Sequence, residues 1–376
     1  ALSVPFGGGA GDKQRWIEYE YDRLAGYDEI FLCMDSDEEG QKATEEIAQR
    51  LGLHRCRIVR LPEKDANACL VKGISAQEVA GCFQNATSLD PEELKRAGFY
   101  TDEVIERFYP AAGKKPGFDL PWSKTHGKIR FLMGELTIWS GFNGSGKSLL
   151  LGQVMADACR QNHLACIASF EMPPPKTLSR MVRQECGETP SKEAITCHMD
   201  WLNKKVWIFD LVGTAKLKRL MDVFDYAHKR YGIRQFVVDS LAKCGLSDDD
   251  YTGQKETVDK LGDFAKRTGS HVHLVVHARK QTDELAPPGK MDVKGTSGIT
   301  DMADNVFIVY RNKAKEKLLQ AIQNGKRPKG ENRSVPEIEQ EYDAFLICDK
   351  SREEGADAEG MYGLRFDRAA QMYTEV

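Results

Sequence analysis

Short apolar runs alternate with helical patterns along the chain from about residue 118 onward. Each run is brief, continuous and bounded by polar or turn residues, which is typical of a strand buried inside a sheet. Seven such strands are predicted, with the sequences ELTIWS, LACIASFE, KVWIFD, RQFVVDS, HVHLVVHA, NVFIVYR and DAFLICDK. Because helical segments follow the first several strands, the pattern predicts a doubly wound α/β core over residues 118–376.

The first third of the chain is organised differently. Residues 27–60 read as an apolar strand, an acidic turn, an amphipathic helix and a second strand, which predicts a small α/β module within residues 1–86. Residues 87–117 predict a linker with one or two amphipathic helices, whose apolar stripe must be buried on this chain or on a neighbour. The apolar positions at helical spacing are Leu94, Val104, Ile105 and Phe108.

The composition is that of an ordinary soluble protein of 376 residues. Its formal net charge is −4, so nucleic-acid binding would have to come from a local patch or from a ring of subunits. Ten cysteines without a C-x-x-C pair predict reduced thiols in a cytosol-like compartment. No apolar run approaches the roughly 18 residues of a membrane span. The chain begins without methionine, which favours a fragment of a longer protein.

Residues 311–333 stand out because they are strongly basic. They predict an inserted helix and loop between two strands. Two interpretations stay open: a solvated helical face, which is the usual meaning of a charge run, and an additional surface for nucleic acid or a partner.

The segment SGFNGSGKSLLLGQ, residues 140–153, contains the pattern G-x-x-x-x-G-K-[ST] between a predicted strand and a predicted helix. Glycines allow backbone N–H groups to turn inward around phosphate oxygens, the lysine reaches the β- and γ-phosphates, and the serine hydroxyl binds magnesium. We therefore expect ATP, or another nucleoside triphosphate, together with Mg²⁺. The expected binding residues are Gly141, Asn143, Gly144, Ser145, Gly146, Lys147 and Ser148.

Three later strand ends carry the residue types that nucleotide hydrolysis needs. Asp239 would hold the magnesium, because ligands approach an α/β sheet at the carboxyl ends of its strands. Glu171 would polarise the attacking water, and His277 would hydrogen-bond the γ-phosphate and sense its loss. A purely structural role stays open for each, above all for the single histidine.

The order and spacing of six sequence blocks resemble those of the RecA-like, DnaB-type ring helicases. The blocks are GFNGSGKSLLLG, SFEM, FVVDS, LVVHARK, KGTSGITDMADNVFIVYRNK and CDKSREEG. Within that family the chain is most similar to the branch that contains the phage helicase-primases and mitochondrial Twinkle. The resemblance covers nearly the whole chain, because CMDSDEEGQKA and LPEKDANAC look like the last part of the TOPRIM fold that precedes the helicase in that branch.

The resemblance implies a role for each site residue. Glu171 matches the family's catalytic glutamate, Asp239 its magnesium aspartate and His277 its γ-phosphate sensor. Lys350 and Arg352 match a basic pair that reaches the nucleotide of the adjacent subunit, with Arg352 as the arginine finger. A further expected pair, Arg311 and Phe366, would sandwich the nucleotide base.

The resemblance places DNA contacts in two channel loops, at residues 241–255 and 278–298. The acidic LSDDD argues against much backbone binding by the first loop. The second would grip phosphates without reading bases, partly through N–H groups made accessible by glycines. The candidate residues are Lys280, Lys290, Lys294, Gly295 and Ser297, with Gly298 behind them.

Asp35 and Asp37 match the D-x-D that binds metal in active TOPRIM enzymes, and two carboxylates this close make a plausible magnesium site. The upstream strand that carries the family's glutamate is absent from the sequence, and so is a zinc-binding cysteine cluster. Primer synthesis by this chain is therefore not expected. The TOPRIM remnant is expected to serve as a structural collar, with the helix of residues 88–110 docking on the adjacent subunit.

The sequence thus predicts an ATP-dependent replicative helicase: a homo-hexamer, or a heptamer, that moves 5′ to 3′ on single-stranded DNA and unwinds forked duplex. A DNA polymerase and a primase are expected partners. The expected location is the cytoplasm of a bacterium or of a phage-infected cell, ahead of mitochondria. Two alternatives stay open: a recombinase-like DNA-binding filament, and a nucleotide-dependent scaffold that does not unwind DNA.

Overall fold

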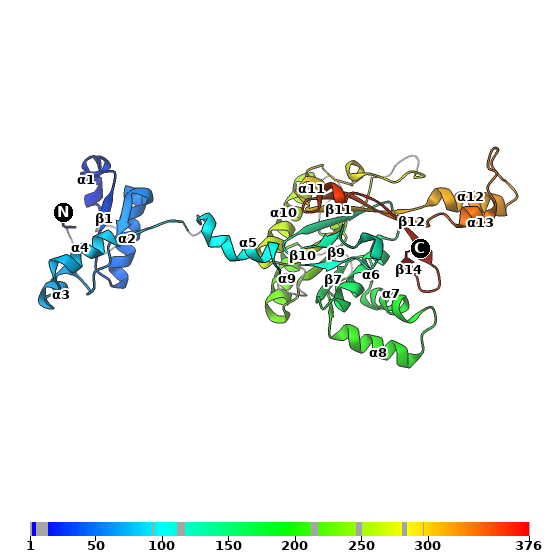
Figure 1. Cartoon of the computed structure of the whole chain (residues 1–376), viewed down its shortest axis with the longest axis horizontal. Helices are drawn as coiled ribbons and strands as arrows, with labels where there is room; N and C mark the ends of the chain where they lie inside the picture. Colours follow the sequence, from blue (N-terminus) through cyan, green and yellow to red (C-terminus); the bar gives the residue numbers. More distant parts are fainter. Residues whose placement is uncertain are drawn as a thin grey trace. The chain divides into compact units, whose positions relative to one another are not determined.

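The computed structural model describes residues 2–4, 14–91, 94–110, 117–211, 217–245, 250–279, 284–295 and 297–375. The chain divides into two compact units, Ala1–Tyr109 and Pro110–Val376 (Figure 1). The finer division at residues 86 and 117 stays a prediction. None of the helices in the described ranges is long and apolar enough to cross a membrane.

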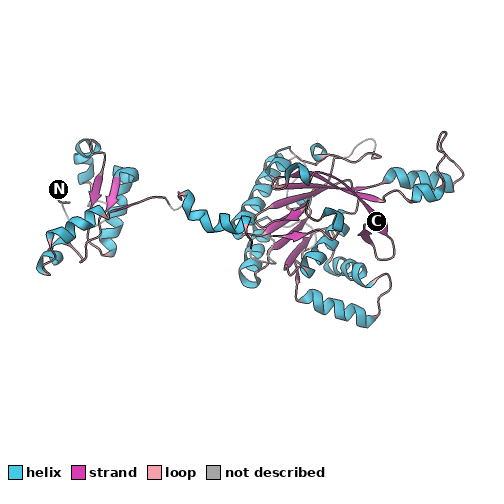
Figure 2. Ribbon diagram, viewed as in Figure 1, coloured by secondary structure: helices cyan, strands magenta, loops and turns pink. Residues whose placement is uncertain are grey.

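A nine-stranded sheet forms the centre of the larger unit (Figure 2). Its strands are β6 (Leu136–Ser140), β7 (Ala165–Ser169), β8 (Val206–Ile208), β9 (Gln235–Asp239), β10 (His271–Val275), β11 (Asn305–Arg311), β12 (Ala344–Ser351), β13 (Gly360–Asp367) and β14 (Met372–Thr374). They lie in the order β14-β13-β12-β11-β6-β10-β9-β7-β8. The strands from β11 to β8 are parallel, and β12, β13 and β14 continue the sheet in antiparallel pairings.

Helices cover both faces of this sheet, which confirms the predicted doubly wound α/β fold. They are α6 (Lys147–Arg160), α7 (Pro174–Cys186), α8 (Lys192–Asn203), α9 (Leu217–Tyr231), α10 (Tyr251–Thr268) and α11 (Ser297–Met302). Two further helices, α12 (Lys313–Gln323) and α13 (Val335–Glu339), pack on each other and project beyond the sheet (Figure 1). A two-stranded ribbon, β4 (Phe118–Asp119) with β5 (Arg130–Phe131), packs beside the sheet.

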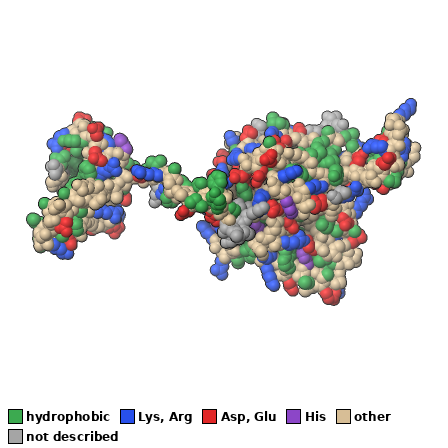
Figure 3. All heavy atoms as spheres, viewed as in Figure 1, with side chains coloured by type: hydrophobic (Ala, Val, Ile, Leu, Met, Phe, Trp, Pro, Cys, Tyr) green, Lys and Arg blue, Asp and Glu red, His purple; other side chains and the backbone are tan. Residues whose placement is uncertain are grey.

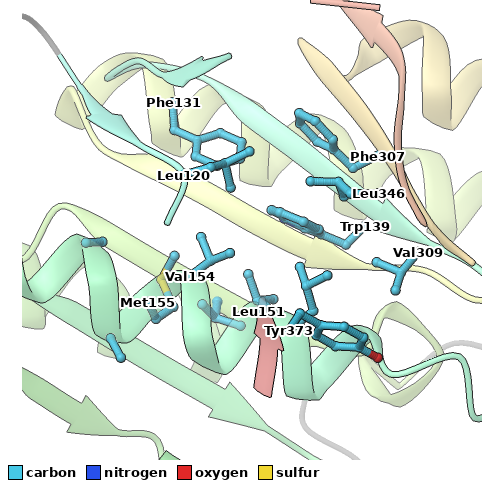
Figure 4. Packing of buried hydrophobic residues seen from close by; sticks show 14 of the residues in the cluster. Leu120, Phe131, Trp139, Leu151, Val154, Met155, Phe307, Val309, Leu346 and Tyr373 are labelled. Carbon is cyan, nitrogen blue, oxygen red and sulfur yellow. The ribbon is translucent and has the colours of Figure 1, made fainter. Parts of the chain in front are cut away.

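Each face of the sheet buries its own apolar core, because successive side chains of a strand point to opposite faces. Trp139 belongs to the core under α6, whereas its neighbour Ile138 belongs to the core under α9 and α10. In the first core the rings of Trp139 and Phe307 stack with centroids 5.1 Å apart, and Phe131 packs against both (Figure 4). These contacts tie β6, the strand that leads into the phosphate-binding loop, to its neighbour β11.

All seven predicted strands are present, and two more were missed. The missed strands, β13 and β14, have the sequences GMYGLRFD and MYT. The first mixes glycine, charged and apolar residues, and the second is only three residues long. Neither carries the continuous apolar run of a central strand, because both lie at the antiparallel end of the sheet.

The smaller unit confirms the predicted strand-helix-strand module. Strands β1 (Ile30–Leu32) and β2 (Cys56–Ile58) are parallel and are joined through α2 (Glu38–Leu51). The first turn of α2 packs closely against the preceding backbone at Gly40. A Cβ atom there would lie 2.1 Å from the backbone oxygen of Asp35. The remaining elements are α1 (Trp16–Ala25), α3 (Ala66–Val71), α4 (Ala76–Gln84) and the short strand β3 (Thr87–Ser88).

The predicted linker contains one α-helix, α5 (Thr101–Phe108), preceded by a 3-10 turn at Ala97–Tyr100. None of its residues is buried. The apolar side chains of this segment are instead largely solvent-exposed: Leu94, Phe99, Tyr100, Val104, Ile105, Phe108 and Tyr109. The stripe is therefore not covered within the described part of this chain.

Candidate nucleotide-binding site

The predicted phosphate-binding loop connects β6 to α6, and two of its glycines are required by their surroundings. Gly141 has a φ of 148°, and a Cβ atom there would lie 2.3 Å from the backbone oxygen of Val309. Gly146 has a φ of 92°, and its Cβ would lie 2.1 Å from the hydroxyl of Tyr373. No larger residue could adopt this loop conformation in this space.

Lys147 begins α6 and turns its side chain back into the loop. Its Nζ donates hydrogen bonds to the backbone oxygens of Gly141 and Phe142, both at 2.9 Å. Burial lowers the pKa of this ammonium to about 8, although the carboxylates of Asp239 and Glu171 oppose the shift. The lysine is thus held, partly desolvated, where phosphate oxygens would approach the loop.

Asp239 and Ser148 form the oxygen pair that would hold magnesium. Asp239 ends β9 and is only 4% exposed. Burial raises the pKa of its carboxyl group, and a hydrogen bond from the Ser148 hydroxyl works in the opposite direction. A carboxylate beside a hydroxyl matches the hard-oxygen preference of Mg²⁺. The buried hydroxyl of Ser145 has no hydrogen-bond partner among the described residues, which leaves a further polar atom for a ligand.

Glu171, Ser240 and His277 form a hydrogen-bonded group across three strand ends. The Ser240 hydroxyl donates to Glu171 Oε1 at 3.0 Å, and His277 Nε2 lies 3.3 Å from the same oxygen. Burial alone would raise the pKa of Glu171, but the contacts with His277 and Ser240 outweigh it and lower that pKa. The carboxylate is therefore ionised at neutral pH and restrained in position, as a residue that orients water should be.

Sequence reasoning missed Ser240 and Tyr373. Ser240 directly follows Asp239. A hydroxyl residue next to a carboxylate at a strand end could have indicated that Ser240 belongs to the site. Tyr373 lies in the unpredicted β14, and its hydroxyl approaches the backbone oxygen of Ser145 at 3.5 Å. No local pattern indicates that a tyrosine so near the end of the sequence covers the phosphate-binding loop.

The two residues expected to sandwich the base lie close to Tyr373. The ring of Phe366 packs on Tyr373 with centroids 5.2 Å apart. Burial raises the pKa of Tyr373 to about 12, and the nearby charge of Arg311 opposes this shift. Arg311 is also paired with Glu316. Both residues thus border the loop, and their contact with a base stays a prediction.

The phosphate-binding loop follows the carboxyl end of β6, whereas Lys350 and Arg352 lie toward the amino ends of the parallel strands. Through β11, Lys350 is in register with Ile138 of β6, and the next residue of β12 with Thr137. Thr137 precedes the loop's first glycine by four residues, which is about 13 Å of strand. The basic pair therefore lies far from the phosphate-binding loop of its own chain.

Within this chain both side chains of the pair have partners. Lys350 Nζ donates to the backbone oxygens of Thr300, Asp301 and Ala303, at 2.9, 2.9 and 2.6 Å. Those carbonyls terminate α11, so the lysine caps this helix. Arg352 Nη1 bonds Asp304 Oδ1 at 2.8 Å, while half of the arginine side chain stays exposed. Its role in a neighbouring site stays a prediction.

The second predicted DNA loop is anchored to the hydrolysis site. The Lys294 N–H donates to the backbone oxygen of His277 at 2.8 Å, and Ala278 bridges to Val293. Lys290 and Lys294 are exposed, as expected for phosphate contacts. Lys280 lies outside the described residues, and Ser297 is described only as the start of α11.

Two expectations about the loops need correction. Gly295 is buried rather than accessible: a Cβ atom there would lie 2.6 Å from Ile299 and 2.7 Å from Gln254, so close packing explains the glycine. The first predicted loop, 241–255, ends early because α10 already begins at Tyr251. Its described start forms a 3-10 turn, and residues 246–249 lie outside the described ranges.

The predicted metal site of the TOPRIM-like module is not supported by its geometry. Asp37 caps α2 by accepting from the Gly40 N–H and pairs with Lys64 at 3.1 Å. The Gly40 hydrogen bond first, and Lys64 second, lower the pKa of this carboxyl group. Across the described ranges, no three His, Cys, Asp or Glu side chains gather as metal ligands, around Asp35 or elsewhere. A structural role accounts for Asp37.

Comparison with known proteins agrees with this geometry. Residues 126–283 match the family described as AAA domain, and residues 7–70 match the family described as Toprim-like. The Twinkle homolog protein, chloroplastic/mitochondrial, of Arabidopsis thaliana is 25% identical over 94% of this chain and 53% of its own length. The DNA helicase/primase of Enterobacteria phage T3 is 23% identical over 82% of this chain and 58% of its own length. Together these similarities support a DnaB-type helicase with a TOPRIM-like module.

A solved structure supports the RecA-like fold of the larger unit. The ATPase domain of G40P superimposes with a TM-score of 0.59 at 14% identity and covers 76% of this chain and 100% of its own. The chain spans a little over half the length of these curated relatives.

The depressed pKa of Lys147 predicts proton uptake when nucleotide binds. Between about pH 8 and the usual lysine value of 10.5 the free site lacks a proton, whereas bound phosphates would favour the ammonium form. At about pH 9 the heat of ATP binding should therefore depend on the ionisation enthalpy of the buffer, with uptake approaching one proton.

Isothermal titration calorimetry in several buffers measures this uptake. At about pH 7 the buffer dependence should nearly disappear, because Lys147 is then already protonated. A Lys147→Arg variant, whose guanidinium does not titrate, should show no uptake at either pH. Equal buffer dependence in the wild type and in this variant would contradict the assignment.

Proposed function

We propose that this chain is an ATP-dependent DNA helicase that works as a ring, with each nucleotide bound between two subunits. One observation carries the proposal: the loop, Glu171, Asp239 and His277 gather at one edge of the sheet, while Arg352 lies at the other. An arginine there can serve a phosphate only in a neighbouring copy. A head-to-tail arrangement that closes into a ring supplies such a neighbour to every site.

The site residues would divide the work of hydrolysis. Lys147 and the loop N–H groups bind the phosphates, and Ser148 with Asp239 holds magnesium, which neutralises phosphate charge. Glu171, kept ionised by Ser240 and His277, orients the attacking water. Arg352 of the adjacent subunit stabilises the charge that develops on the transferred phosphoryl group.

His277 would link hydrolysis to DNA movement. Its side chain contacts Glu171, and its backbone oxygen holds Lys294 of the second loop. A shift of this histidine after phosphate loss would therefore move the loop that carries Lys290 and Lys294. Exposed lysines of this kind bind the backbone of single-stranded DNA without reading its sequence.

Lys350 would act through α11 rather than on the nucleotide. It caps the carboxyl end of α11, the helix that directly follows the second loop. The contact couples the loop to the strand that carries Arg352. We therefore assign Lys350 as a positioning residue within its own subunit.

The exposed stripe of α5 would dock on the adjacent subunit and hold the ring together. Val104, Ile105 and Phe108 lie at helical spacing and are each at least half exposed. The TOPRIM-like module would serve as a collar without primer synthesis, since its metal site is not supported.

The names of the relatives extend the proposal to replication. One relative is named a DNA helicase/primase and another a Twinkle homolog, which agrees with DNA as the substrate. The resemblance noted in the sequence further implies single-stranded and forked DNA and travel from 5′ to 3′. A hexamer, a partner polymerase and a primase, and a cytoplasmic setting belong to the same analogy. The rival function, a scaffold that binds nucleotide without unwinding, is disfavoured by the ordered contact of Glu171 with Ser240 and His277.

A subunit-mixing experiment tests the shared site. Lys147→Ala and Arg352→Ala should each lower DNA-stimulated ATP hydrolysis by about 10³-fold or more, since an arginine finger contributes on this order. In an equal mixture about a quarter of the interfaces would combine an intact loop with an intact arginine. Hydrolysis should then recover to about that share of the wild-type rate.

An Arg333→Ala variant is the matched control. It removes another ion-paired arginine, which pairs with Glu331 and Glu341 and is remote in sequence from the phosphate-binding loop. It should hydrolyse ATP normally. If the two inactive variants stay inactive when mixed under conditions where rings assemble, the site is not shared between subunits.

Assembly through α5 is tested by Val104→Asp together with Phe108→Asp. Burying one large apolar side chain contributes about 1.5–3 kcal/mol, so losing two should weaken association at least ~100-fold. Sedimentation velocity with ATP and Mg²⁺ should show smaller species than the wild type. The control is Glu103→Ala with Glu106→Ala, on the polar side of the same helix. Unchanged assembly of the double Asp variant would exclude docking through this stripe.

A further inference from the structure

The basic insertion forms a projecting arm of the ATPase unit. The arm consists of α12, the connecting loop 324–334 and α13, and it extends from the carboxyl end of β11 (Figure 1). Its base is rigid, because the buried Lys315 bonds the backbone oxygens of Glu339 and Glu341 and the carboxylate of Asp343, at 2.9, 2.6 and 2.7 Å. The arm therefore holds its outer loop at a fixed place.

Charge is concentrated at the outer end of the arm. Residues 311–333 contain eight basic and two acidic side chains, a net of +6 in a chain whose formal net charge is −4. The tip, residues 324–330, carries Lys326, Arg327 and Lys329 and no acidic residue. Figure 3 shows Lys and Arg side chains at this end of the unit.

The three tip cations are not neutralised. All three are exposed, and none forms an ion pair with a carboxylate in the described part of the chain. Arg327 donates to the backbone oxygens of Glu331 and Arg333, which positions its guanidinium. Its charge also helps to lower the pKa of Glu331, but the two side chains form no ion pair. By contrast, Arg333 at the base of the loop is paired with two glutamates.

The chemistry of the arm favours phosphate groups over a protein surface. Protein interfaces depend on exposed aromatic or aliphatic anchors surrounded by a polar rim. The described residues 311–341 contain no large apolar side chain that is exposed. Clustered, exposed Lys and Arg without such anchors fit the uniform negative charge of a nucleic-acid backbone.

The arm is also continuous with the second DNA loop. Lys313 of α12 pairs with Glu284, and the Tyr310 hydroxyl donates to the backbone oxygen of Leu285 at 2.5 Å. The Lys290 N–H donates to Asp349 of β12. Residues 284 and 285 of the loop thus contact the base of the arm. A DNA strand bound at Lys290 and Lys294 would therefore pass close to the basic surface of the arm.

We propose that the tip cations Lys326, Arg327 and Lys329 bind the phosphate backbone of DNA outside the channel. The proposal rests on the proposed function only in assigning the loop of residues 284–295 to the channel. Binding by the tip is sequence-independent and salt-sensitive, and it does not require ATP hydrolysis.

Fluorescence anisotropy of labelled duplex and single-stranded oligonucleotides with the full chain tests this proposal. The affinity for duplex DNA falls as salt rises, and each phosphate contact contributes about −0.9 to the slope of log affinity against log salt. The triple variant Lys326→Ala, Arg327→Ala and Lys329→Ala should therefore have a shallower slope, by about 2.7. Between about 50 and 200 mM salt the wild type should then lose roughly 40-fold more affinity than the triple variant. A loss confined to duplex or to single strands would identify which DNA the arm contacts.

Two controls accompany the triple variant. Lys192→Ala, Lys204→Ala and Lys218→Ala remove the same charge from other exposed positions and should leave the slope unchanged. The charge-conserving variant Lys326→Arg, Arg327→Lys and Lys329→Arg should bind as the wild type does. Unaltered DNA affinity and slope in the alanine triple variant would overturn the proposal and point to an acidic protein partner. Failure of the helicase proposal would instead appear as absent strand displacement with this binding difference intact.

Discussion

The parallel register of four central strands is the constraint on which the site depends. In the hydrogen-bonded ladder, Trp139 of β6 is level with Val275 of β10, which is level with Asp239 of β9, and Asp239 is level with Ser169 of β7. The residues that follow these positions emerge together at one edge of the sheet. A shift of one residue in β7 or β10 would turn the side chains of that strand to the opposite face and separate Glu171 from His277. The stacked rings of Trp139 and Phe307 maintain this register by tying β6 to β11.

The same register underlies the proposal that each nucleotide site is shared between two subunits. Because β12 runs antiparallel to β11, its carboxyl end emerges at the edge away from the phosphate-binding loop. Lys350 and Arg352 are carried there with it, and each finds local partners in α11 and Asp304. The geometry separates the cation from the phosphates within a subunit. Under the proposed function, hydrolysis would therefore depend on a neighbouring subunit, as suits a motor whose sites act in turn.

Much of this arrangement could be predicted from the sequence, because the central strands and the phosphate-binding loop carry strong local signals. Continuous apolar runs identified seven of the nine strands of the sheet, and strand-end positions drew attention to Asp239, Glu171 and His277. Local pattern could not reveal Tyr373 or Ser240, since their roles arise from long-range packing of β14 and from the contact of β9 with β7. Gly295 was misjudged for a similar reason: its exposure depends on Gln254 of α10, which is remote in sequence. Asp37 also caps α2, a local role that the D-x-D motif did not indicate, and its predicted metal binding stays a prediction.

The most direct test of the central claim is strand displacement by the purified chain on forked duplexes with either a 5′ or a 3′ single-stranded tail. The account predicts ATP-dependent displacement on the 5′-tailed fork, little on the 3′-tailed fork, and hydrolysis that rises when DNA is added. Hydrolysis that ignores DNA, with neither fork opened, would contradict the motor and favour a nucleotide-dependent scaffold.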